Sequence, residues 1–276
     1  MNAQLSLGLS PCPNDTFIFH ALLHGLVPSP VHIEPHFADV EELNTLTRQK
    51  QLEVSKISLG AVAHIMDAYA LLNSGAALGW GCGPLVVARE RLPQKTWRTA
   101  RVATPGPLTT ANLLLDLHGG FQGPRLPMLF NEIMPSVARG EADMGVIIHE
   151  GRFTYQRVGL KKILDMGEWW EETFRVPLPL GAIVARRDLP LRTARAMQTA
   201  IAASLAHARV HPDDPRNFIR AHAQELEESV TQAHIATFVT DFSLDLGAQG
   251  RAAIETLVGK AAALQGRRMP RELFLQ

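Results

Sequence analysis

The order of strand-like and helix-like patterns along the chain limits its fold more than any other feature. Residues 5–9 alternate as a half-buried strand does, residues 10–15 are rich in turn formers, and residues 16–23 are typical of a helix. A second alternation at 31–35 precedes a polar helix over 40–50, and residues 55–60 lead into an apolar stretch over 61–72. This order predicts an α/β fold with parallel strands joined by crossover helices.

Composition excludes several classes of protein. The 276 residues are 46% hydrophobic, enough for one large core or two modest ones. Lys plus Arg and Asp plus Glu are both 27, and no basic run is interleaved with aromatic residues, so we expect no nucleic-acid partner. The chain lacks an amino-terminal secretory pattern and a run of about 18 apolar residues, so we expect a cytoplasmic protein with no membrane partner. Cys12 and Cys82 are too few for a disulfide framework or a metal cluster, and we expect both to be reduced.

A short internal echo suggests how the chain is divided. The segment VVARERLP at 86–93 is echoed by IVARRDLP at 183–190, although chance similarity is an alternative. We interpret residues 86–88 and 183–185 as adjacent crossing strands between two lobes. Residues 1–88 and 184–276 would form a discontinuous first α/β lobe, and residues 89–183 an inserted second α/β lobe.

The inserted lobe has its own strand and helix series. We expect strands at 101–104, 128–130 and 144–148, and helices from Thr109 and up to Gly140. Past Pro190 the chain is expected to be helical, with Ala-rich runs at 194–208 and 252–264. Two α/β lobes joined by two hinge strands enclose a central cleft, and this architecture resembles the type II periplasmic-binding-protein-like fold. A fold-level resemblance does not by itself give a function.

In an α/β fold, ligands bind beyond the carboxyl ends of strands, and four segments would meet there. They are residues 13–16, 56–58, 109–111 and 148–152. Thr109, Thr110 and Ala111 place hydroxyl and N–H groups at a helix start, which suits a substrate carboxylate, although an ordinary Thr cap explains the same pattern. Ser58 faces a similar choice between a substrate contact and a helix cap, as do Asn14 and Asp15.

His149 emerges from a buried strand into a charged and aromatic turn. A histidine in such a place can act as a base near neutral pH, although a structural role is the alternative. Glu150 and Arg152 beside it could form a surface ion pair. Trp169 and Trp170 could line an aromatic pocket or pack between the lobes.

The chain shows no nucleophile elbow, G-x-G-x-x-G, P-loop or H-E-x-x-H pattern, so neither a nucleotide cofactor nor a catalytic metal is supported.

Four segments taken together resemble the 1,4-dihydroxy-6-naphthoate synthase family of the futalosine route to menaquinone. They are SPCPNDTF at 10–17, GPLVVAR at 83–89, the Thr-Thr-Ala at 109–111, and IHEGRFTY at 148–155. Their order and spacing match along nearly the whole chain, and the segments of Asn14 and His149 are the specific ones. Leu108 stands where a polar residue would be expected before the Thr pair.

The resemblance implies a lyase that converts cyclic dehypoxanthine futalosine to 1,4-dihydroxy-6-naphthoate, with release of a ribose-derived fragment and without a cofactor. It implies that His149 is the base and that Lys56, Ile57, Ser58, Thr110 and Ala111 contact the substrate, a small carboxylated molecule. The alternatives are a related dehydratase of the same route, resembling chorismate dehydratase, and a non-catalytic solute-binding protein. The His149 segment argues against the first, and the absence of a signal segment argues against the second.

Overall fold

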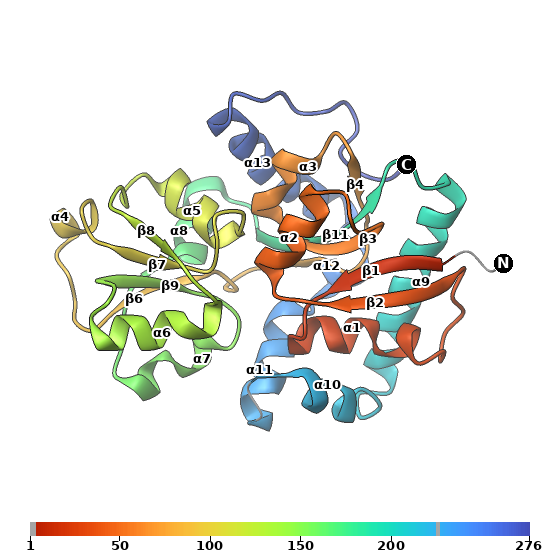
Figure 1. The fold of residues 1–276 in the computed structure, drawn as a ribbon, viewed down its shortest axis with the longest axis horizontal. Helices are drawn as coiled ribbons and strands as arrows, with labels where there is room; N and C mark the ends of the chain where they lie inside the picture. Colours follow the sequence, from red (N-terminus) through yellow and green to blue (C-terminus); the bar gives the residue numbers. More distant parts are fainter. Residues whose placement is uncertain (1–3, 225–226) are drawn as a thin grey trace.

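The computed structural model describes residues 4–224 and 227–276, and it has two α/β lobes that lie side by side (Figure 1). The first lobe holds a six-stranded sheet in the order β2-β1-β3-β11-β4, with β5 also paired to β11. The second lobe holds a five-stranded sheet in the order β10-β6-β9-β7-β8. The α/β class and the two-lobed fold are therefore confirmed.

The strands of the first lobe are β1 (Gln4–Leu9), β2 (His32–Phe37), β3 (Val54–Ser58), β4 (Tyr69–Leu71), β5 (Ala77–Gly79) and β11 (Leu178–Arg186). Its helices are α1 (Pro13–Leu23), α2 (Val40–Arg48), η1 (Leu59–Ala61), α3 (Val62–Ile65), α9 (Leu191–Val210), α10 (Arg216–His222), α11 (Glu228–Phe238), α12 (Asp241–Leu244) and α13 (Gly247–Leu264). As predicted, β1 pairs in parallel with β2 and β3. The expected crossover helix α1 packs against α9.

The strands of the second lobe are β6 (Leu85–Ala88), β7 (Val102–Thr104), β8 (Arg125–Pro127), β9 (Met144–Ile147) and β10 (Lys161–Asp165). Its helices are α4 (Gln94–Trp97), α5 (Thr110–His118), α6 (Phe130–Arg139), α7 (Gly151–Thr154), η2 (Tyr155–Val158) and α8 (Met166–Phe174). Strand β7 is parallel to β8 and β9, whereas β6 is antiparallel to β9 and β10. Both sheets are thus mixed.

The predicted pairing of the two echoed segments is wrong. Residues 86–88 belong to β6 and bond to β9 and β10 of the second sheet. Residues 183–185 belong to β11 and bond to β3 and β4 of the first sheet. The chain crosses between the sheets after Gly79 and again before Leu178, a few residues ahead of both predicted boundaries. Each echoed segment is an apolar strand because a sheet buries both of its faces, so the likeness reflects burial rather than pairing.

Two local predictions also need correction. Helix α1 begins at Pro13 and is preceded by Cys12 as its N-cap residue, so neither Asn14 nor Asp15 caps it. Proline suits the first helical position because its missing N–H would have no partner there. The strand expected at 128–130 lies three residues earlier, and Phe130 begins α6.

The apolar core joins the two lobes. One cluster of buried side chains runs from Ile57 and Leu59 of the first lobe to Val86, Val102 and Leu114 of the second. A second cluster lies between the first sheet and α1 and α9. Because apolar burial is continuous across the boundary, the two lobes are packed against each other there. No helix among the described residues is long and apolar enough to cross a bilayer.

Candidate active site

A cavity between the lobes is lined by all nine residues that the sequence singled out. Its lining includes Asn14, Asp15, Lys56, Ile57, Ser58, Thr109, Thr110, Ala111 and His149. Strand ends and helix starts supply these residues, as expected for an α/β sheet. The cavity also reaches Ile148 and Arg152, which belong to the predicted segment 148–152. Other lining residues were not predicted from the sequence, namely Ser10, Val40, Ala77, Cys82, Gly83, Pro84, Leu180, Gly181 and Phe238.

Asp15 is the centre of a buried polar network on the first-lobe side. Its side chain is fully buried, and Oδ2 accepts hydrogen bonds from the backbone N and the Oγ of Ser10, at 3.1 and 2.7 Å. Its Oδ1 accepts from Asn14 Nδ2 at 2.9 Å and pairs with Lys56 Nζ at 2.8 Å. Both carboxylate oxygens therefore accept hydrogen bonds from the protein, and these bonds offset the cost of burying the charge.

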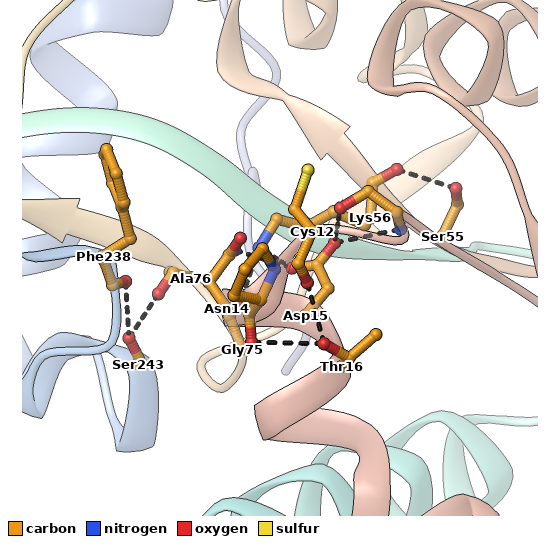
Figure 2. Close-up of polar contacts among 12 residues, drawn as sticks. Cys12, Asn14, Asp15, Thr16, Ser55, Lys56, Gly75, Ala76, Phe238 and Ser243 are labelled. Atoms are coloured by element: carbon orange, nitrogen blue, oxygen red, sulfur yellow. Dashed lines mark hydrogen bonds and ion pairs between the residues drawn. The ribbon is translucent and has the colours of Figure 1, made fainter. Parts of the chain in front are cut away.

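Lys56 reaches the same network from β3 (Figure 2). Its ammonium pairs with Asp15 and donates to the carbonyl oxygen of Gly75 at 3.2 Å. Two of its three N–H groups are thereby used, and the side chain is 6% exposed. Because Lys56 also lines the cavity, its charge is held at the cavity wall.

His149 follows β9 and enters the cavity from the second lobe. Its backbone φ of 52° is in the left-handed region, which costs a non-glycine residue about 1–2 kcal/mol. The ring packs edge-on against Phe130, with centroids 5.0 Å apart. Burial lowers the pKa of His149, Asp39 and Asp15 oppose this shift, and the Lys56 ammonium adds to it. The neutral form, which can accept a proton, is therefore favoured.

His234 is a buried member of the site that sequence reasoning missed. It lies on α11 with no exposed surface, and its ring is nearly parallel to that of His149, with centroids 5.9 Å apart. Its Nε2 lies 2.9 Å from Asn14 Oδ1. The sequence held one signal, because His234 stands between Val230 and Phe238 on the buried face of the helix.

The hydroxyl groups at the start of α5 bond within the protein, and the ordinary Thr cap that the sequence left open forms at Thr109. Thr109 caps the helix, since its Oγ1 accepts from the N–H of Asn112. Thr110 Oγ1 donates to the carbonyl of Leu180 at 2.5 Å and accepts from Gly60 N at 3.1 Å, so it connects the two lobes. The backbone N–H groups of Thr110 and Ala111 precede the first intrahelical bond and remain suited to an anion.

Ser58 and Ile57 stand at the end of β3. The backbone N of Ser58 donates to Asn44 Oδ1 at 2.8 Å, and Ser58 has no side-chain cap bond to η1. Ile57 is fully buried and pairs with Ala182 of β11. The helix-cap reading of Ser58 is therefore wrong.

Arg152 lines the cavity and is held by two bonds to the protein. It donates to the carbonyl of Gly83 at 2.5 Å and pairs with Asp165 at 2.8 Å, whereas Glu150 is buried. A surface pair between Glu150 and Arg152 is thus not what forms. Trp170 is fully buried in the core and Trp169 packs against His118, so neither lines the cavity.

Two α/β lobes that close on a cavity define the class of binding-protein-like folds. The alkanesulfonate-binding protein of Xanthomonas axonopodis has a TM-score of 0.70 at 16% identity, covering 98% of this chain and 96% of that one. A ligand-binding component of an import system from Staphylococcus aureus also has a TM-score of 0.70, at 11% identity over 99% and 96% of the two chains. At these identities the likeness shows the fold alone.

The chain belongs to the menaquinone biosynthesis family, whose model matches residues 5–263. It is 49% identical to a protein of Thermus thermophilus over 94% of both chains, and 44% identical to one of Streptomyces coelicolor over 94% and 93%. Both relatives are named 1,4-dihydroxy-6-naphtoate synthase. A crystal structure from Archaeoglobus fulgidus has a TM-score of 0.89 at 33% identity, covering 95% of this chain and 98% of that one.

Proposed function

We propose that this chain is a 1,4-dihydroxy-6-naphthoate synthase, a lyase that forms its product from cyclic dehypoxanthine futalosine. The observation that carries the proposal is His149, a histidine biased toward its neutral form at a cavity between two lobes. It stands in the segment that resembles the synthase family most specifically. The family match over nearly the whole chain supports the same substrate.

The reaction requires a base more than any other group. His149 takes a proton from the carbon next to a ketone, the electron pair forms a ring double bond, and a ribose-derived fragment leaves. Because the product ring is aromatic, the elimination is thermodynamically favourable. It needs mainly a positioned base and an enclosed site. The Lys56 ammonium at the cavity wall stabilises negative charge on a substrate oxygen as the proton leaves.

The substrate carboxylate is assigned to the start of α5. The backbone N–H groups of Thr110 and Ala111 lie where the helix dipole favours an anion, and Ser58 lies across the same cavity. The Thr110 hydroxyl takes no part in binding the carboxylate, because it already bonds to Leu180 and Gly60. Asp15 pairs with the ammonium of Lys56, and Asn14 donates a hydrogen bond to the same Asp15 oxygen.

The two cysteines are free and buried, as suits a reducing compartment, and we place the enzyme in the cytoplasm. Its partner is a small carboxylated molecule, with no nucleic acid and no membrane involved.

The test is incubation of the purified protein with cyclic dehypoxanthine futalosine, followed by absorbance and mass measurements of the naphthoate. Formation of the naphthoate supports the proposal. Tight binding of the substrate without turnover would point to a solute-binding protein. Turnover of chorismate in place of the futalosine derivative would point to the related dehydratase.

A further inference from the structure

A chain of hydrogen bonds leads from His234 to the cavity wall. His234 Nε2 meets Asn14 Oδ1, Asn14 Nδ2 meets Asp15 Oδ1, and Asp15 Oδ1 meets Lys56 Nζ. The four side chains come from α11, α1 and β3, and each is at least 94% buried. Of the four, His234 is the one that does not line the cavity.

The direction of each bond follows from the chemistry of Asp15. A carboxylate that pairs with an ammonium only accepts hydrogen bonds, so the Asn14 amide must turn its Nδ2 toward Asp15. The Asn14 oxygen then faces His234, and His234 must donate from Nε2. Orientation of the amide and tautomer of the ring are thereby set by the network itself.

The surroundings of His234 keep its ring neutral. Burial lowers its pKa well below the ordinary value, and the neighbouring His149 and Lys56 act in the same direction. Among the described residues, Glu150 also faces the ring, with its Oε1 3.8 Å from Nδ1. A neutral ring with its proton on Nε2 leaves Nδ1 as a lone-pair acceptor.

We infer that His234 is a positioning residue for the reaction: as a neutral Nε2–H donor it holds the Asn14 amide, and through Asp15 it directs the Lys56 ammonium into the cavity. This inference rests on the proposed function for its kinetic consequence only. Without the donor, the Asn14 oxygen would be buried without a partner, and the side chain would turn its oxygen toward the cavity that it lines and release its bond to Asp15. Lys56 would then lose its single orientation.

Two substitutions separate this role from simple packing. His234→Gln keeps an N–H donor near the position of Nε2, whereas His234→Phe keeps the ring and removes the donor. The inference predicts that His234→Phe lowers kcat by about 10-fold or more with a small change in KM, and that His234→Gln stays within about 3-fold of the parent. A packing role predicts the reverse order, because α11 buries Val230 and Phe238 on the same face.

A double-variant cycle tests whether His234 acts through Asn14. In an Asn14→Leu background, His234→Phe should cost little further activity, because the bond it removes is already lost. Equal and additive losses in the two backgrounds would overturn the inference, as would a His234→Phe variant more active than His234→Gln.

A measurement on the unmodified protein does not depend on substrate. Nitrogen-15 spectroscopy of the histidine rings, with the His234 ring assigned from its own backbone by triple-resonance spectra, should show the neutral Nε2–H form at pH 7. The opposite tautomer or a charged ring at pH 7 would overturn the network, even if the kinetic variants did not fold. If the parent protein failed to convert cyclic dehypoxanthine futalosine but gave the expected spectrum, the proposed function would fall while the network stood.

Discussion

The hydroxyl of Thr110 connects the two lobes, because its Oγ1 donates to the carbonyl oxygen of Leu180 at 2.5 Å. Thr110 begins α5 in the second lobe, and Leu180 lies on β11 in the first. The same oxygen accepts from Gly60 N, so one side chain satisfies two backbone groups across the cleft. Closure of the lobes and the geometry of the α5 start are therefore coupled.

Replacing Thr110 should loosen this connection. Thr110→Val keeps the shape of the side chain but leaves Gly60 N and Leu180 O without their partner in the closed form. Substrate binding should weaken by about 1–3 kcal/mol, the usual cost of a lost buried hydrogen bond. Thr110→Ser keeps the hydroxyl and serves as the control. Calorimetric titration with the naphthoate product measures the difference, and equal affinities of the Val and Ser variants would contradict the bridging role.

Gly60 should be essential for closure for a steric reason. A Cβ on Gly60 would lie 2.6 Å from the carbonyl oxygen of Thr109 in the opposite lobe. Gly60→Ala should therefore keep the lobes apart and lower product affinity by about 10-fold or more, since only the closed form completes the site. Gly259→Ala is the matched control, because no atom of the described residues lies within 4 Å of a Cβ added there. Small-angle scattering with saturating product should show compaction in the control alone.

His149 should control the pH dependence of turnover. The pKa of His149 lies below the ordinary 6.5, so the ring is neutral at pH 6.5 and above. As the pH falls through this lowered pKa, the ring becomes protonated and kcat/KM should fall. His149→Asn should lower kcat by about 100-fold or more with little change in substrate binding. His64→Asn, outside the cavity, should behave as the parent. Near-normal turnover in His149→Asn would remove this residue from the mechanism and direct attention to Asp15.

Removing one partner of the buried Asp15–Lys56 pair should destabilise the protein more than removing both. Lys56→Met leaves a buried carboxylate without its cation and should reduce the free energy of unfolding by about 3–5 kcal/mol. The double variant Asp15→Asn with Lys56→Met removes both charges and should recover much of that loss. Lys95→Met, at an exposed position, should change stability by less than about 0.5 kcal/mol. Urea unfolding measures all three, and a double variant no more stable than Lys56→Met would argue against a coupled pair.

Local sequence determined where most strands and helices form and which loops meet. Alternation at residues 5–9 and 31–35 predicted β1 and β2, and the Ala-rich runs predicted α9 and α13. The loops of Asn14, Ser58, Thr110 and His149 were expected to converge, because the carboxyl ends of parallel strands share one edge of a sheet. The shared cavity agrees with that expectation.

Only the tertiary structure decided which strands pair with β6 and which with β11. It also decided the role of His234 and the bonds of the Thr110 hydroxyl. Each depends on a hydrogen bond between residues far apart in the chain, such as His234 to Asn14 and Thr110 to Leu180. Side-chain periodicity reports which face of an element is buried, but it carries no information about the partner that lies against that face. The echoed apolar segments show this limit, since burial made them alike while the sheets around them placed them in different lobes.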